Sequence, residues 1–171
     1  MTAVDLMKLE LARLHTSFDK AFDGLTPEQL HQVPAGHPKA NTIAWGVWHY
    51  VRTEDNVVRF ILQNRRPIVW HEGGYPDKLA LPPVAQDTGM STAEAQALRL
   101  KDLGLFREYM ARVWASTDEY LARVDPAALE ATVTIKPLGD MPGIRALAQV
   151  CVSHGFTHLG EIELARTLVG G

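Results

Sequence analysis

Residues 147–169 read LAQVCVSHGFTHLGEIELARTLV, and this stretch shows most clearly how the chain folds. Its apolar residues and histidines recur every three or four positions, which is the period of an α-helix. The inward stripe is Leu147, Cys151, His154, His158, Ile162, Ala165 and Val169, and the opposite side carries Arg145, Gln149, Ser153, Glu163 and Thr167. We therefore predict a helix over residues 144–169 that directs His154 and His158 into the protein.

The same period predicts three more long helices, over about residues 2–24, 41–64 and 91–124. Ser91 and Glu94 form a capping box at the start of the last of these. Only residues 132–136 alternate like a brief strand. Four amphipathic helices and almost no strand predict one all-α domain over residues 1–171, a four-helix bundle with long crossover connections.

The longest connection covers residues 65–90 and is rich in proline and glycine. We expect it to lack secondary structure, and such connections are more often functional or mobile than accidental. It contains the mixed aromatic and polar run Trp70, His71, Glu72, Gly73, Gly74 and Tyr75. This run is either a lid or pocket wall over the bundle, or a solvated loop.

Composition excludes several classes of protein. The chain has 171 residues, 46% hydrophobic and 22% charged, and a net charge of -3 without a basic block, which argues against nucleic acid as a partner. No apolar run approaches the roughly 18 residues of a membrane span, and residues 1–6 lack a signal-peptide pattern. The single cysteine, Cys151, fits a reducing compartment. We expect a soluble cytoplasmic protein.

His154 and His158 are four residues apart, so on a helix their Cβ atoms lie about 6 Å from each other. Two buried imidazoles that close cannot both be charged, and a divalent metal would bind both as neutral ligands. Alternatively, each is a core histidine satisfied by a hydrogen bond. Gly155 follows His154, so the His-Glu-x-x-His pattern of zinc proteases is absent.

A third ligand should come from a facing helix. His49 is the candidate because it is the only histidine in the predicted helix over 41–64, and His15 in the first helix is the second choice. The widest apolar arc of that helix, which includes Val47 and Val51, points away from His49. The helix must then be buried on both sides, for example between its own bundle and a partner subunit. Three imidazoles would leave positions open for water or substrate.

Two neighbours of the histidines have open roles. Glu161 lies one turn beyond His158 and is either a hydrogen-bonding partner or general base at the site, or a partly exposed glutamate near the helix end. Cys151 lies three residues before His154 and is a fourth ligand, a reactive thiol or, preferably, a small buried apolar side chain.

Residues 45–54 (WGVWHYVRTE) and 154–166 (HGFTHLGEIELAR) resemble the DinB-like metalloprotein superfamily, which includes YfiT-like proteins, thiol-dependent S-transferases and maleylpyruvate isomerases. The resemblance implies the DinB/YfiT-like type of bundle, with one divalent metal, commonly zinc or nickel, held by His49, His154 and His158. It also implies a homodimer, and neither DNA polymerase activity nor DNA binding. Glu161 stands where the family usually has glutamine.

We therefore expect a metal-dependent transferase. A low-molecular-weight thiol from outside the protein would attack a small-molecule electrophile, and Glu161 would orient a ligand or accept a proton. The alternatives are a non-catalytic metal-binding bundle, acting as a sensor or structural dimer, and a metal-dependent hydrolase that needs no thiol.

Overall fold

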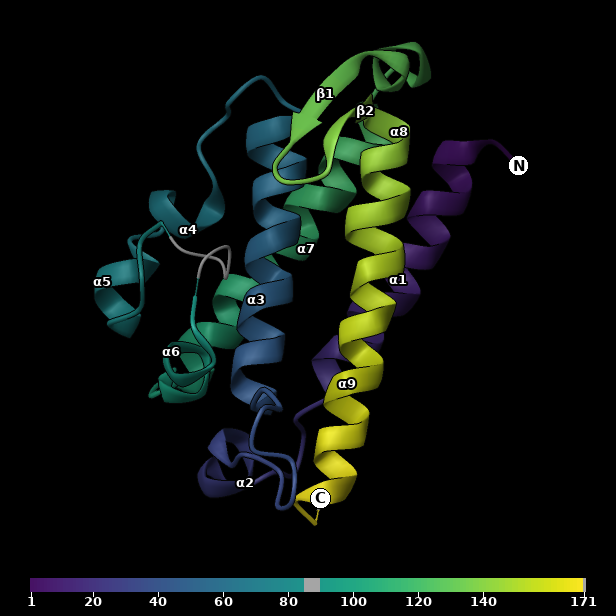
Figure 1. Ribbon diagram of the computed structural model, residues 1–171. Helices are drawn as coiled ribbons and strands as arrows, with labels where there is room; N and C mark the ends of the chain where they lie inside the picture. The colour runs from purple at the N-terminus through teal and green to yellow at the C-terminus, as the bar shows by residue number, and fades with distance from the viewer. Residues whose placement is uncertain (85–89, 171) are drawn as a thin grey trace.

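The computed structural model describes residues 1–84 and 90–170, and most of these residues are helical (Figure 1). This confirms the prediction of a mainly helical fold. The long helical segments are α1 (Ala3–Lys20), α3 (Ile43–Asp55) with the π-helix η1 (Asn56–Ile61), α7 (Leu103–Arg123), and α8 (Gly143–Ala146) with the π-helix η3 (Leu147–Ser153) and α9 (His154–Leu168).

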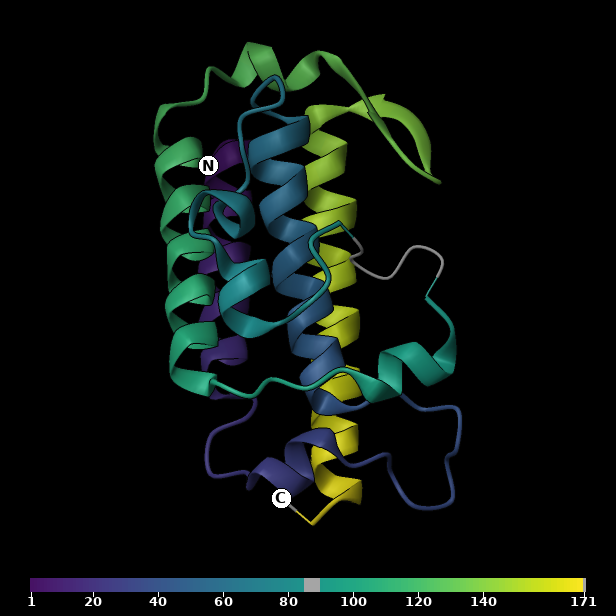
Figure 2. The same ribbon diagram turned by 90° about the vertical axis from the view of Figure 1, so that its left-hand side faces the viewer.

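The long helices run side by side (Figures 1 and 2). Helices α3 and α7 run in one direction, and α1 and α9 run in the opposite direction. The chain must therefore cross the length of the molecule between α3 and α7, over residues 62–102. This is the long crossover connection that the sequence predicts.

The helices begin where the sequence supplies caps. The side chain of Thr42 accepts a hydrogen bond from the backbone N–H of Trp45 at the start of α3. Asp102 accepts one from the N–H of Leu105 at the start of α7. The short helix α2 (Pro27–His31) begins with the capping box of Thr26 and Gln29. These side chains satisfy N–H groups that lack a partner in the first turn.

Helix α3 is the centre of the fold, and each of its 13 residues is buried. It contacts α2, α4, α7 and α9, so neighbours cover it on several sides. The side that carries His49 and the apolar arc of Val47 and Val51 are therefore both buried within a single chain. No partner subunit is needed to explain why the arc points away from His49.

The prediction for residues 65–90 is wrong over the described part of that segment, which forms α4 (Val69–Glu72) and α5 (Tyr75–Leu79). Trp70 and Tyr75 are fully buried, and their rings pack on Tyr109 of α7. Trp70 and Tyr75 thus belong to the core, whereas His71 and Glu72 of the same run are exposed. Residues 85–89 of the predicted loop lie outside the described residues.

One buried carboxylate explains how α4 is attached to α3. Asp55 accepts hydrogen bonds from the backbone N–H groups of Val69 and Trp70, both at 2.9 Å, and from the Tyr109 hydroxyl at 3.1 Å. Burial raises the pKa of Asp55, although these hydrogen bonds oppose the rise. Asp55 therefore caps a helix that lies far from it in the sequence.

The predicted helix over residues 91–124 is in fact two helices, α6 (Thr92–Ala97) and α7. The capping box of Ser91 and Glu94 is present, but the chain becomes extended at Leu98 and a new helix begins after Asp102. In between, the N–H of Leu100 donates to the His31 ring at 2.9 Å, and the Leu98 and Leu100 side chains are buried. The two leucines bury their side chains from an extended segment, so the apolar spacing that predicts one continuous helix does not decide the structure here.

The predicted strand is present as β1 (Thr132–Ile135), but it pairs with a second strand, β2 (Gly139–Pro142), that the sequence does not indicate. The hairpin follows the 3₁₀-helix η2 (Pro126–Glu130) and contacts both α8 and η1 (Figure 1). Across residues 1–84 and 90–170, no helix combines the length and apolar character needed to cross a membrane.

Candidate metal centre

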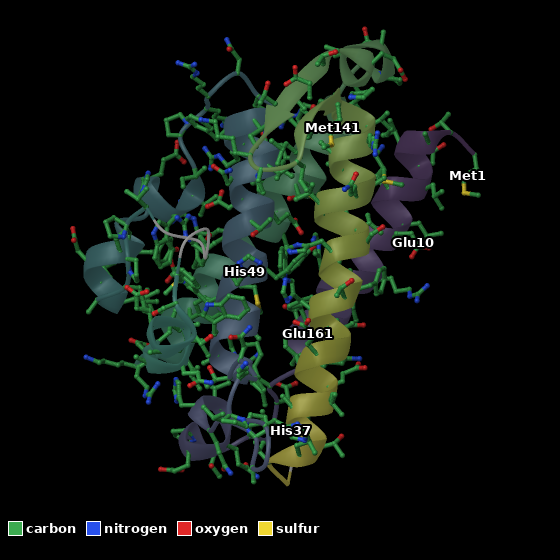
Figure 3. All side chains as sticks on the ribbon, viewed as in Figure 1. Met1, Glu10, His37, His49, Met141 and Glu161 are labelled. Atoms are coloured by element: carbon green, nitrogen blue, oxygen red, sulfur yellow. The ribbon has the colours of Figure 1, made fainter. Side chains whose placement is uncertain are left out.

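His49, His154 and His158 come together between α3 and α9. The Nε2 atoms of His49 and His154 are 3.4 Å apart, and those of His154 and His158 are 2.9 Å apart. Figure 3 shows His49 on α3 and Glu161 further along α9. The structure therefore gathers the three histidines that the sequence singles out.

The spacing of these nitrogen atoms suits one metal ion. A metal–nitrogen bond is about 2.0–2.1 Å, so two imidazole nitrogens on one ion are about 2.9 Å apart at a right angle and about 3.4 Å apart at the tetrahedral angle. The two separations in the structure match these values. The three imidazoles could therefore hold a metal ion.

Trp45 fixes the ring of His49. It lies one turn earlier on α3 and stacks on His49 with ring centroids 4.8 Å apart and planes 7° apart. The same indole and the ring of His158 are close to perpendicular, with centroids 6.0 Å apart. Because Trp45, His49 and His158 are each less than one-tenth exposed, the rings have little room to turn.

Glu161 fixes the ring of His158. One carboxylate oxygen is 2.8 Å from Nδ1 of His158, while Nε2 of the same ring points to His154. Metal-binding histidines commonly make such a contact through the nitrogen that does not bind the metal. Glu161 itself is 58% exposed, so the side chain is both exposed and in contact with the site.

Gly155 allows α9 to approach its neighbours between the two histidines. A Cβ atom there would lie 2.6 Å from the ring of Tyr50 and would collide with Leu14 of α1. The hydroxyl oxygen of Tyr50 also lies 3.0 Å from the carbonyl oxygen of Cys151 in η3. The sequence contains a signal for this close approach, a glycine inside a strongly helical stretch, but periodicity alone does not explain it.

A buried charged network lies beside the histidines, and the sequence analysis missed it. Glu54 is fully buried and accepts hydrogen bonds from Tyr50 and Thr117, both at 2.6 Å, and from His15 at 2.9 Å. Burial alone would lower the pKa of His15, but the Glu54 carboxylate outweighs it and raises that pKa. Burial likewise opposes ionisation of Glu54, and His15, Thr117 and Tyr50 together lower its pKa.

His15, the second choice as a ligand, belongs to this network and stacks on Trp114 with centroids 4.0 Å apart. Cys151 is fully buried, and burial with the nearby Glu54 carboxylate raises its pKa well above the usual range. Its thiol therefore stays protonated. The preferred interpretation of Cys151 as a small buried side chain is confirmed.

A cavity of about 1030 Å³ begins at His49 and His154. It extends along η1 and η3 to the turn of the β-hairpin, and its polar lining includes Thr53, Asn56 and Gln149. A second cavity of about 400 Å³ is lined by Gly46 and Glu161, among others. The larger cavity gives a small molecule a route to two of the three histidines.

Comparison with known proteins agrees with this fold. The family model described as the DinB superfamily matches residues 10–162. A crystal structure of a conserved protein from Enterococcus faecalis is similar over 99% of this chain and 98% of its own, with a TM-score of 0.84 and 22% sequence identity. At that identity the likeness concerns the fold alone. A search of curated proteins found no match.

Proposed function

Because the chain belongs to the DinB superfamily, whose members often bind a metal, we propose that His49, His154 and His158 bind one divalent metal ion inside a four-helix bundle of that type. The observation that carries the proposal is the convergence of three imidazole nitrogens from α3 and α9, with two of these histidines lining a cavity. Three neutral imidazoles suit zinc or nickel, and they leave coordination positions open.

The open cavity favours catalysis over a purely structural role, because structural sites are usually closed by four protein ligands. We propose a transferase that uses a low-molecular-weight thiol from outside the protein. A divalent ion bound here would lower the pKa of that thiol. The sulfur then attacks an electrophile and forms a sulfur–carbon bond, the leaving group departs with the electron pair of its own bond, and the thiol proton passes to water.

The protein's own residues position the reactants. Glu161 orients His158, and the support for this role over proton transfer is its contact with Nδ1, away from the other histidines. Trp45 holds His49 and excludes water from one side of the site. Cys151 takes no part, because its thiol is buried and protonated.

Elemental analysis of protein purified without a histidine tag tests the metal site. We expect close to one equivalent of zinc or nickel in the wild type and in His71→Ala, whose histidine is exposed and does not belong to the cluster of three. The double variant His154→Ala, His158→Ala should retain little metal. Equal metal content in all three proteins would refute the site.

A conjugation assay tests the reaction. The metal-loaded protein should consume an electrophile only when a thiol is present, and the His154→Ala, His158→Ala variant should be inactive. Consumption without thiol would favour hydrolysis, and no consumption with bound metal would favour a sensor or structural role. A cytoplasmic homodimer is also part of the proposal, and light scattering of the purified protein tests its mass.

A further inference from the structure

The larger cavity has cations at its outer end. Arg65 and Lys136 are among its lining residues, and no described lining residue is an aspartate or glutamate. Neither cation forms an ion pair within residues 1–84 and 90–170. Because the whole chain carries a net charge of -3, this positive end is a local property of the cavity.

The fold places the two cations in the lining of one cavity from distant segments. Arg65 follows η1 with a φ of 64°, and its N–H donates to the carbonyl of Phe60 at 2.7 Å. Asn64, which also lines the cavity, has a φ of 51°. Few residues other than glycine adopt such left-handed conformations. Lys136 lies in the turn between β1 and β2, on the other wall.

The nearest carboxylate on the hairpin points to a different partner. Asp140 pairs with Thr134 across the hairpin and accepts a hydrogen bond from its hydroxyl at 2.6 Å. Arg66, beside Arg65, donates to Gln63 and lines a separate hollow. Arg65 and Lys136 thus line the cavity, whereas Asp140 and Arg66 do not.

The distance from the histidines to the cations indicates the length of the ligand. His49 and Ile61 are twelve residues apart on one helical segment, which at the α-helical rise of 1.5 Å per residue corresponds to at most about 18 Å. Between them the wall offers polar groups from Thr53, Asn56 and Gln149. An electrophile of a few atoms at the histidines would leave most of this wall without contacts.

We propose that the site binds an elongated organic anion, whose carboxylate lies at Arg65 and Lys136 and whose polar middle lies along η1 and η3. The reactive end lies at His49 and His154, and only this part of the inference rests on the proposed function. The anion is either the thiol or the electrophile, and both would present the same carboxylate to the same cations.

Calorimetric titration separates these two sources. S-Methylglutathione, whose sulfur is blocked, and its diethyl ester represent the thiol; 4-chloro-3-nitrobenzoate and its methyl ester represent the electrophile. We expect one of the acids to bind about tenfold more tightly than its ester, because two exposed ion pairs each contribute modestly. Added salt should reduce that difference.

Variants locate the effect. Arg65→Gln with Lys136→Gln should weaken binding of the acid about tenfold and leave the ester unchanged. Arg66→Gln with Lys101→Gln removes the same charge from outside the cavity and should bind the acid as the wild type does. The proposal is wrong if neither acid binds at millimolar concentration, if acid and ester bind equally, or if both double variants lose the same affinity.

The titrations are run on metal-free and metal-loaded protein. Because the blocked sulfur cannot be deprotonated, the carboxylate effect does not depend on metal in the thiol arm. A failure of metal binding with the carboxylate effect intact would refute the proposed function and leave the anion site standing. Metal binding without a carboxylate effect would refute the anion site and leave the proposed metal site standing.

Discussion

Replacement of Gly155 by alanine tests whether the close approach of α9 creates the site. The added Cβ would lie 2.6 and 2.8 Å from two atoms of the Tyr50 ring and would also overlap Leu14. Carbon atoms in contact are normally about 3.5–4.0 Å apart, so something must move by roughly 1 Å. Tyr50 cannot easily move, because it stacks on Phe18 and its hydroxyl contacts Glu54 and Cys151.

The expected cost follows from two opposing effects. Overpacking of a tight core costs about 1–3 kcal/mol, and the rigid surroundings put this site near the upper value. Alanine in place of glycine within a helix returns about 1 kcal/mol. We therefore expect Gly155→Ala to lower the free energy of unfolding by about 2 kcal/mol, or the melting temperature by about 4–8 °C.

Gly160→Ala is the matched control on the same helix. No atom lies within 4 Å of its added Cβ, so only the helix preference remains and the variant should be about 1 kcal/mol more stable than wild type. Urea unfolding measures both variants without metal. Metal titration should then show about tenfold weaker binding for Gly155→Ala only, because α9 moves away from His49. Equal stability of the two variants would refute the reasoning.

Four further predictions concern the buried carboxylates, His15 and Glu161. Glu54→Gln should lower the free energy of unfolding, measured in urea, by about 3 kcal/mol. The variant removes the negative carboxylate that accepts the hydrogen bond from His15 and leaves that buried ring without its charged partner. Folding raises the pKa of His15 from its ordinary value of 6.5. The difference in free energy of unfolding between the wild type and His15→Gln should therefore be largest below pH 6.5 and should be lost as the pH rises through the pKa of His15 in the folded protein. Asp55→Asn should cost about 2 kcal/mol and speed amide exchange in α4, because an amide cannot accept from all three donors. Glu161→Ala should weaken metal binding about tenfold, whereas Glu161→Gln, which can still accept from His158, should retain most of it; equal loss in both would exclude the orienting role.

The helical elements were predictable where one face of a long segment is continuously apolar, as in residues 144–169. The break between α6 and α7 was not, because Leu98 and Leu100 keep the apolar pattern while the chain runs extended. The histidine pair followed from its spacing, and His49 was the candidate partner as the only histidine of its predicted helix, a choice that the resemblance to a family strengthened. Arg65 and Lys136 gave no signal, since only the folded hairpin brings them to one cavity.

The π-helical segments explain why periodicity alone describes the cavity poorly. In a π-turn each N–H donates to the carbonyl five residues earlier, so every such turn shifts the following residues by about 100° relative to an α-helix. Gln149 was predicted on the side opposite the inward stripe, yet with η3 in place it lines the cavity. Asn56 in η1 lines the opposite wall. The helix that carries His154 thus changes its winding directly before that histidine, and the change turns Gln149 toward the space where a substrate would lie. Uninterrupted α-helices with the same sequence would keep Gln149 on the outer face, so the winding itself provides part of the polar wall.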